Sequence, residues 1–323
     1  MKRIIAFILC LVMAFSLCAC KGDEPAPSTE PTAEPTPEIS YAPVSFKNHG
    51  KRSPVTALPQ KVVTAGPNCT EVFCALGLED KVIGKCMENH SLGALTEYAE
   101  AVDSIPTLSV GYPTAQQIID SGCDFLYASS WIFDDELTVA QLEKAGITVY
   151  VSEAETIDAV WQELRDLGKV FLVDNIEEIV SEQCTRLEAV TDKLGEVTEP
   201  KSVFVLDSVI GDKLYTAGGT NIESAYIAAA GGVNAMSELT KAWDAVEVSA
   251  VVAADPWCIV IHDYEGSSYD DKVAALKADP ELSQLDCVKN ERFVRLSLED
   301  AMPGMRAVPT VEAIAQALYP DMF

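Results

Sequence analysis

The chain has 323 residues, and its 50 acidic side chains against 23 lysines and arginines give a formal net charge of −27. Such an acidic surface repels phosphate backbones, which excludes nucleic-acid binding, and its field also opposes the capture of strongly anionic ligands. The length is sufficient for one large domain or for two lobes with a substantial core.

Residues 1–20 predict a lipoprotein signal peptide. Two basic residues precede the apolar stretch Ile4–Ser16, which is too short to span a bilayer comfortably. The quartet Leu17–Cys20 resembles the bacterial lipobox, in which a small residue precedes the cysteine that is acylated, so Cys20 after Ala19 is the expected lipid-bearing residue. This interpretation places the protein outside the cytoplasm, anchored to the cell membrane; an ordinary secretory signal with incidental cysteines is the alternative.

Residues 21–56 are expected to form a tether between the membrane and a globular body. The segment up to about residue 40 is rich in Pro, Glu, Ser and Thr and has almost no apolar side chains to bury, so it stays extended. His49 falls in the tether region and is not expected to take part in binding.

The cysteines argue against a disulfide framework and against a zinc site. Three of the ten cysteines belong to the signal region, and the others form no C-x-x-C pair. Most of these others lie inside apolar runs, where a free cysteine behaves as a small hydrophobic residue, although one or two bridges stay open in an exported protein. They are Cys69, Cys74, Cys86, Cys123, Cys184, Cys258 and Cys287.

From residue 57 to residue 173, short apolar runs alternate with helical stretches, which is typical of a parallel sheet covered by helices. Asn68 with Glu71 and Thr114 with Gln117 have the spacing of helix-start capping pairs. The expected strands are Lys61–Ala65, Lys81–Gly84, Asp124–Ala128 and Ile147–Val151, and the expected helices end at Leu76, Gly122, Lys144 and Phe171.

A long amphipathic helix is expected over residues 174–197, with Asp174 and Glu177 at its start. The alternation of strands and helices then resumes over residues 198–323. The expected strands are Ser202–Asp207, Cys258–His262 and Phe293–Leu296, and the expected helices begin at Thr220 with Glu223, at Ser249 and at Thr310.

The stretches at 115–130 and 248–263 repeat one pattern, a short helix, a breaker and an apolar strand. The sequence therefore predicts an α/β fold of two similar βα lobes with mostly parallel sheets, joined by one long rigid helix. The N-terminal ligand-binding lobe spans 57–173 and the C-terminal one spans 198–323. Ligands of open α/β sheets bind at the carboxyl ends of strands, so a cleft is expected between the lobes.

Several segments in order resemble the solute-binding proteins that serve ABC importers of iron–siderophores, haem and cobalamin. They are VVTAGPNCTEVFCALGLEDKVIG, DFLYASS, LEKAGITVYV, TAGGTNIESAYIAAAGGVNA, KAWDAVEVSAVVAADPWCIVI, CVKNERFV and PGMRAVPTVEAIAQALYP. The resemblance covers residues 61–320. It implies a monomeric binding protein with no resident cofactor and no catalytic residues, which captures a metal chelate and delivers it to a membrane permease and its ATPase.

The family usually carries a surface glutamate at the start of a short helix in each lobe, which docks on permease arginines. The equivalent positions here are Gln116 and Ser249, and neither is charged. Other acids on this surface, a different permease, or a protein that binds and signals without import are the alternatives.

Candidate ligand-binding residues are those at strand ends and helix starts. Four aromatic side chains among them, Tyr112, Trp131, Trp243 and Tyr264, could stack on a flat chelate ring, and Arg306 could anchor an anionic group. The full set is Asn68, Cys69, Asn89, His90, Tyr112, Ser129, Ser130, Trp131, Asp207, Ser208, Thr216, Trp243, His262, Asp263, Tyr264 and Arg306. Core packing for Trp243 and a structural ion pair for Arg306 are the competing interpretations.

His90 and His262 fall at the expected cleft, one in each lobe. They are candidates for axial ligands of a cobalt or iron centre, or for a metal site with Asp263; hydrogen bonding at the surface is the alternative. The three or four close ligands of a bare-metal receptor cannot be assembled from the sequence.

The leading hypothesis is capture of a metal chelate, either a ferric siderophore or a cobalamin-like corrinoid. The scarcity of basic residues near the cleft favours the less anionic corrinoid. A receptor for a bare transition metal or another small solute is the second hypothesis. An enzyme with Cys69 as nucleophile and His90 as base, and an adhesive surface lipoprotein, are the remaining ones.

Overall fold

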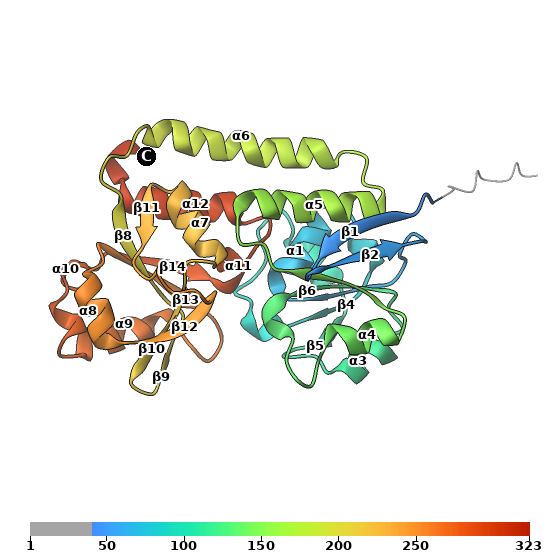
Figure 1. Ribbon diagram of the computed structural model, residues 1–323, viewed down its shortest axis with the longest axis horizontal. Coiled ribbons are helices and arrows are strands. Elements are labelled where there is room, and N and C mark those ends of the chain that lie inside the picture. The colour runs from blue at the N-terminus through green and yellow to red at the C-terminus, as the bar shows by residue number, and fades with distance from the viewer. Residues whose placement is uncertain (1–40) are drawn as a thin grey trace, which may run out of the picture. The chain divides into compact units, whose positions relative to one another are not determined.

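The computed structural model describes residues 41–323, so the predicted signal peptide, Cys20 and residues 21–40 of the predicted tether lie outside the described residues. Within 41–323, no helix has both the length and the apolar character needed to cross a membrane. Figure 1 shows two α/β lobes connected along one side by helices.

The N-terminal lobe is built on a five-stranded parallel sheet with the order β5-β4-β3-β6-β7. Because the chain runs outward in both directions from the β3–β6 pair, the carboxyl ends of β3 and β6 form a topological switch point. The strands are β3 (Val62–Ala65), β4 (Val82–Cys86), β5 (Thr107–Ser109), β6 (Phe125–Ser129) and β7 (Thr148–Ser152), and the helices are α1 (Pro67–Ala75), α2 (Ala99–Ser104), α3 (Ala115–Asp120), α4 (Val139–Lys144) and α5 (Ile157–Phe171).

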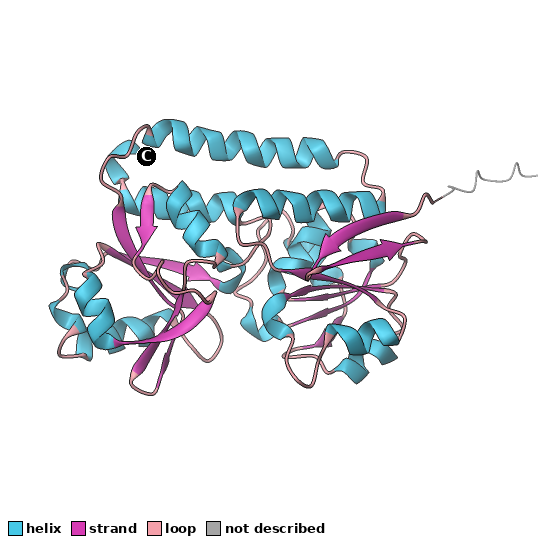
Figure 2. Cartoon of the chain, in the orientation of Figure 1, coloured by secondary structure: helices cyan, strands magenta, loops and turns pink. Residues whose placement is uncertain are grey.

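The C-terminal lobe has a four-stranded parallel sheet, β11-β8-β13-β14, and a three-stranded antiparallel sheet, β12-β10-β9. Figure 2 shows both sheets among their helices. The strands are β8 (Lys201–Leu206), β9 (Ser208–Ile210), β10 (Lys213–Ala217), β11 (Gly232–Asn234), β12 (Trp243–Glu247), β13 (Cys258–Asp263) and β14 (Phe293–Ser297). The helices are α7 (Ile222–Ala229), α8 (Val248–Ala254), α9 (Tyr269–Ala278), α10 (Asp286–Lys289), α11 (Leu298–Ala301) and α12 (Ala307–Leu318).

Helix α6 (Ile176–Leu194) connects the lobes and packs against α5 of one lobe and α12 of the other. Its apolar face follows from Val180, Val190 and Leu194, which are buried at helical spacing. The predicted fold of two similar lobes with mostly parallel sheets and one long connecting helix is thus confirmed.

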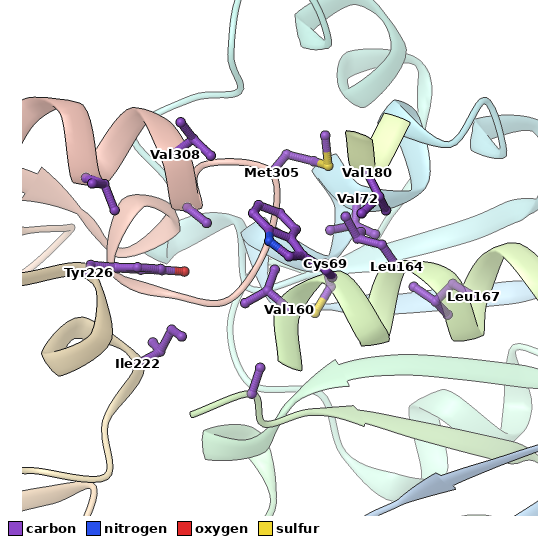
Figure 3. Close-up of a cluster of buried hydrophobic side chains, with 14 of the residues drawn as sticks. Cys69, Val72, Val160, Leu164, Leu167, Val180, Ile222, Tyr226, Met305 and Val308 are labelled. Atoms are coloured by element: carbon purple, nitrogen blue, oxygen red, sulfur yellow. The ribbon is translucent and has the colours of Figure 1, made fainter. Parts of the chain in front are cut away.

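One hydrophobic core runs through the region where the lobes meet. Figure 3 shows Cys69 and Val72 of α1 and Leu164 of α5 near Val308 of α12 and Tyr226 of α7. Burying these side chains together, at roughly 25 cal/mol per Å² of apolar surface, holds the two lobes as one cooperative unit.

A β-hairpin was not predicted and replaces part of the expected tether. Strands β1 (Val44–Asn48) and β2 (Lys51–Val55) pair antiparallel, and His49 and Gly50 form the turn with φ of 49° and 73°. Two consecutive residues with positive φ give the tight turn that matches the twist of a hairpin. Phe46 and Val55 enter the core, so the folded body begins before residue 56, where the sequence analysis ended the tether.

Of the four helix starts predicted from capping pairs, three are wrong and one is confirmed. The helices expected to begin at Ser249 and Thr310 begin at Val248 and Ala307. Thr114 and Gln117 form the predicted capping box. Asn68 instead lies inside α1, whose start is set by Pro67. Helix α6 begins after Asn175 with no side-chain cap, and α7 is capped by Asn221 rather than by Thr220. The polar side chains of α1 form hydrogen bonds with the C-terminal lobe instead of capping the helix. The local sequence pattern does not reveal these long-range bonds.

Candidate binding cleft

A cavity of about 860 Å³ lies between the two lobes. The N-terminal lobe contributes the end of β7, the start of α5 and the β1–β2 turn. The C-terminal lobe contributes the start of α7, Trp243 and the segment 301–303. On the N-terminal lobe the cavity therefore lies at the carboxyl ends of the parallel strands β6 and β7, whereas on the C-terminal lobe it is lined by helix starts and loops.

The cavity wall on the N-terminal lobe is acidic. Glu153, Glu155, Glu163 and Asp166 line it, and Lys47 is the lysine among the lining residues. His49, from the hairpin turn, places its Nδ1 2.9 Å from Glu153 Oε2. Because carboxylates outnumber cations on this wall, the cavity favours ligands that are neutral, cationic or rich in N–H donors.

Glu163 is buried in this wall within a network of hydrogen bonds. Its carboxylate accepts from Tyr127 Oη at 3.2 Å, from Ser152 Oγ at 2.9 Å and from the backbone N–H of Glu153 at 2.9 Å. Burial is the largest influence and raises the pKa of Glu163 to about 7, although these hydrogen bonds act in the opposite direction. The charge of the wall therefore changes near neutral pH.

Trp131 and Trp243 line the cavity from opposite lobes. Trp131 lies in the short 3₁₀ turn Ser130–Ile132 after β6, and Ser130 also lines the cavity. Trp243 starts β12 and stacks on Tyr215, with the ring centroids 5.8 Å apart. The two indoles give a ligand flat, apolar contact surfaces from both lobes.

Four of the predicted residues form an aromatic cluster that joins the lobes beside the cavity. The centroid of the His90 ring lies 5.8 Å from that of Tyr112, 5.6 Å from that of Trp131 and 5.8 Å from that of Tyr264. Of these four residues, Tyr264 alone comes from the C-terminal lobe. The His90 and Tyr264 rings are nearly parallel, at 12°. We call this set the interlobe aromatic cluster.

His262 is fully buried, and both of its ring nitrogens are engaged. Its Nδ1 lies 3.0 Å from Asp207 Oδ1 and its Nε2 lies 2.8 Å from Glu223 Oε1. Burial alone would lower the pKa of His262, but the charges and hydrogen bonds of Glu223 and Asp207 raise it to about 10. His262 is therefore an imidazolium that donates two hydrogen bonds, and it has no nitrogen left for an axial metal ligand.

Asp207 is the partly exposed member of this group, whereas the side chains of His262 and Glu223 are buried. Burial would raise the pKa of Asp207, but the hydrogen bond and charge of His262 hold it below the ordinary value. The hydroxyl of Tyr264 lies 3.4 Å from its Oδ2. Ser208 follows in β9, half-buried, and Thr216 of β10 is fully buried.

Asn68, Cys69 and Ser129 are brought together at the β3–β6 switch point, but they are buried. Asn68 Nδ2 donates to the Pro303 carbonyl at 2.8 Å, and Ser129 Oγ donates to Asn68 Oδ1 at 2.9 Å. The Cys69 Sγ lies 3.6 Å from Ser129 Oγ, and burial raises the pKa of its thiol well above the usual value. Cys69 does not contact His90, so the structure does not assemble the cysteine–histidine pair of the enzyme hypothesis.

Arg306 and Asp263 are engaged in structural ion pairs. Arg306 Nε donates to Glu71 Oε2 at 2.8 Å, and its Nη1 donates to Asp300 Oδ1 at 3.1 Å. Asp263 accepts from Arg295 Nε at 2.6 Å and from the backbone N–H of Tyr269 at 2.9 Å. Neither side chain is free to anchor a ligand. Arg306 forms the structural ion pair that was the competing interpretation in the sequence analysis. Among residues 41–323, no group of three or more His, Cys, Asp or Glu is arranged to hold a metal ion.

The family model for a periplasmic binding protein matches residues 62–298. The chain belongs to the periplasmic binding protein family. This confirms the resemblance that the ordered sequence segments carried.

The relatives of this periplasmic binding protein include an uncharacterised ABC transporter substrate-binding lipoprotein, YvrC, of Bacillus subtilis, 26% identical over 82% of each chain. A cobalamin-binding protein of Halobacterium salinarum is 26% identical, over 62% of this chain and 53% of its own. A periplasmic binding protein from Veillonella parvula has a similar structure, with a TM-score of 0.74 at 25% identity, covering 86% of this chain and 98% of the other.

Gln116 and Ser249, which the sequence resemblance places at the permease-docking positions, lie on the surface of this periplasmic binding protein. Gln116 is exposed in the first turn of α3, where its Nε2 donates to Asp120 Oδ1 at 2.7 Å, and Ser249 is exposed in the first turn of α8. The nearest acids along the chain are Asp120 at the end of α3 and Glu247 just before α8.

Sequence reasoning missed most of the cavity wall, including Glu163 and Asp166 of α5 and the segments 220–222 and 301–303 of the C-terminal lobe. Two further missed parts lie next to elements that the sequence analysis had considered. The first is the segment 152–156, which follows the correctly expected strand β7 and belongs to the same sheet edge as Trp131. The strand-end rule that selected Ser129 and Ser130 could have found this segment. The second part is the hairpin turn with His49, in which two consecutive residues have positive φ. The pair His-Gly is only a weak sequence signal for such a turn.

Proposed function

We propose that the chain is the extracytoplasmic solute-binding component of an ABC importer and that its interlobe cavity captures a metal chelate for delivery to a permease and its ATPase. Family membership and the relationship to a substrate-binding lipoprotein support this role. The cavity between the two lobes supports the place of binding. The protein acts by binding and release, as a monomer, without a resident cofactor.

The cobalamin-like corrinoid is the ligand class that the cavity supports best. The observation that carries this choice is the combination of an acidic wall with Trp131 and Trp243, which line the cavity from opposite lobes. A corrinoid offers a broad macrocycle for stacking and peripheral carboxamides whose N–H groups can donate to Glu153, Glu155 and Asp166. The relationship to a cobalamin-binding protein supports the same class.

Ferric siderophores are the second candidate, restricted by charge. With Arg306 paired to Glu71, a strongly anionic catecholate chelate would meet an acidic wall with few cations. A neutral or cationic ferric chelate meets the same requirements as a corrinoid. The affinity for a series of chelates of decreasing negative charge should therefore rise.

The anchor and the docking surface complete the proposal. We infer that Cys20 carries the lipid and that the following segment holds the body near the membrane, as the sequence predicts. Docking would use the surface around Gln116 and Ser249, with Asp120 and Glu247 supplying the negative charge for permease arginines.

The test is thermal unfolding of the purified chain with cobalamin, cobinamide, haem, ferric siderophores and free divalent metals. A ligand that binds only the folded state adds about 2.7 kcal/mol at a hundred times its Kd, a shift of several degrees. Trp243→Leu should weaken the effective ligand at least tenfold. Trp257→Phe is the matched control, because Trp257 packs on Lys201 and Arg292 away from the cavity. No stabilisation by any chelate, with the chain folded, would reject the proposal.

A further inference from the structure

A second cavity, of about 240 Å³, lies at the junction of the two lobes and shares no lining residue with the cavity of the cleft. We call it the junction cavity. The N-terminal lobe contributes α1, the end of β4 and parts of the segment 88–103, and the C-terminal lobe contributes Glu299 of α11. Since one water takes about 30 Å³ in the liquid, the space exceeds what a single bound water fills.

The junction cavity has a buried polar floor and an acidic rim. Glu299 is 1% exposed, Glu71 2% and Lys85 7%, and all three line it. Asp103 is exposed and Glu88 is half-buried, and both line it as well. Four carboxylates and one lysine therefore surround this space.

The ion pairs of the junction cavity leave one buried carboxylate without a cation. Glu71 is paired with Arg306 at 2.8 Å, and Lys85 Nζ lies 2.8 Å from Glu88 Oε1. Glu299 forms no ion pair with any of the residues 41–323. Its charge is the one that the surrounding protein does not compensate.

The carboxyl group of Glu299 is satisfied at one oxygen only. The Ser91 hydroxyl and the Leu92 N–H both donate to Oε1, the latter at 3.1 Å. The other oxygen, Oε2, is buried and has no hydrogen-bond partner within the described range 41–323. Burial raises the pKa of Glu299, although the bond from Ser91 and the charge of Arg306 act in the opposite direction. Because Glu299 lines the junction cavity, Oε2 is the carboxylate oxygen that a molecule inside it can reach.

The charges select the chemical class of that molecule. Buried carboxylates that outnumber the cations exclude an anion. Within residues 41–323, no group of three or more His, Cys, Asp or Glu is arranged to hold a metal ion, so a bare metal lacks its ligands here. A primary ammonium group brings one positive charge and three N–H donors, which suit an unpaired carboxylate oxygen. A short aliphatic amine is also small enough for the volume.

We propose that the junction cavity is a second binding site, for a small organic ammonium ion held by Glu299 Oε2. The site is separate from the proposed chelate site, because the two cavities have no residue in common. Glu299 belongs to the C-terminal lobe and the other lining residues to the N-terminal lobe. A bound ammonium ion therefore adds a contact between the lobes and stabilises the folded chain.

The test is thermal unfolding of the purified chain at pH 8 with methylammonium or 1,4-diaminobutane. Tetramethylammonium, potassium and calcium chlorides at the same ionic strength are the comparisons. The melting temperature should rise, and saturate, with the two primary amines only, since tetramethylammonium carries the same charge without N–H donors.

Two substitutions locate the site. Glu299→Gln keeps the size of the side chain and removes its charge, so it should raise the Kd for methylammonium by about tenfold or more. Glu238→Gln is the matched control, because Glu238 is exposed and does not line the junction cavity, and its Kd should equal that of wild type. The melting temperature of unliganded Glu299→Gln separates loss of the site from loss of folding.

Asp103→Asn provides a second variant if Glu299→Gln fails to fold. Asp103 is exposed on the rim, and its removal should weaken methylammonium by about two- to fivefold.

The proposal is overturned if neither amine stabilises the wild type, or if a folded Glu299→Gln binds methylammonium as tightly as wild type. Equal stabilisation by tetramethylammonium or potassium would overturn it too, since screening of the acidic chain would then explain the effect. Stabilisation by calcium alone would assign the cavity to a metal instead. None of these outcomes bears on the chelate, which binds in the other cavity.

Discussion

Arg306 and Glu71 lie 235 residues apart in the chain and form a two-pronged ion pair at the junction of the lobes. The side chains are 8% and 2% exposed. Glu71 comes from α1 of the N-terminal lobe and Arg306 from the residue before α12, so this pair, with the bond from Asn68 to Pro303, ties the two lobes beside the switch point.

Replacing Arg306 by Ala should destabilise the whole fold. The substitution leaves the Glu71 carboxylate buried without a cation, with the backbone N–H of Leu95 as its remaining donor, which costs about 3–5 kcal/mol. Urea denaturation at pH 7 measures the change. Arg186→Ala is the matched control, because the Arg186–Glu312 pair is largely exposed and should contribute about 0–1 kcal/mol. Equal losses of unfolding free energy in the two variants would show that another group stabilises the Glu71 carboxylate.

The His262 cluster should make stability depend on pH above neutrality. The pKa of His262 is about 10 in the folded state and about 6.5 in an unfolded chain, so the protonated ring stabilises the fold fully below about pH 6.5. That contribution is lost as the pH rises through about 10. The stability advantage of wild type over His262→Gln should therefore shrink between pH 7 and pH 10 in urea denaturation.

Lys272 titrates in the same range, because burial lowers its pKa to about 8 where its Nζ donates to the His262 carbonyl at 2.7 Å. It is present in both proteins, so its contribution cancels in the difference. A constant difference across this range would mean that His262 does not change its protonation between the folded and unfolded states.

The parallel sheets could be read from the sequence, because each central strand is an apolar run bounded by turn residues. Phe125–Ser129 and Cys258–Asp263 are buried along their length and lie close to where they were expected. The β1–β2 hairpin could not be read in the same way, since Lys51, Arg52 and Pro54 give β2 the composition of a loop. It folds because Asn48 exchanges two 2.7 Å hydrogen bonds with the backbone of Val151 in β7.

Of the residues that the sequence selected, Ser130, Trp131 and Trp243 line the cavity, and the others lie outside its wall. Trp131 and Trp243 line the cavity because strand ends and nearby turns converge there. Arg306 and His262 were selected by the same rule, but their distant partners Glu71 and Glu223 decide what they do. Such pairings depend on the packing of the lobes, and local spacing carries no information about them.

Labelling should distinguish Cys184 from every other cysteine of the folded body. Cys184 is half-buried on α6, whereas the others are buried, and burial raises the pKa of their thiols above the usual value. Since the thiolate is the reactive form, brief treatment with iodoacetamide at pH 8 should modify Cys184 first. Peptide mass spectrometry checks the site. Early modification of Cys69 in the native chain would revive the hypothesis of a cysteine enzyme.

Glu163 should give the fold a second pH dependence, on the acid side of neutrality. Its pKa is about 7 in the folded state and about 4.3 in an unfolded chain, so the protonated carboxyl favours folding below about pH 4.3, and this contribution is lost as the pH rises through 7. Glu163→Gln mimics the protonated form at every pH. Its stability should therefore increase relative to wild type between pH 4 and pH 8, as measured by urea denaturation.

Ser152→Ala supplies an internal check on this assignment. The Ser152 hydroxyl donates to the Glu163 carboxylate at 2.9 Å and favours the ionised form, so its removal should raise the pKa of Glu163 further and move the loss of stability to higher pH. If the pH midpoint of the loss of stability is the same in Ser152→Ala as in wild type, a group other than Glu163 titrates. Glu163 lines the cavity, so its protonation removes one negative charge from the wall that faces the ligand. The affinity for a cationic chelate should therefore fall as the pH is lowered over the same range.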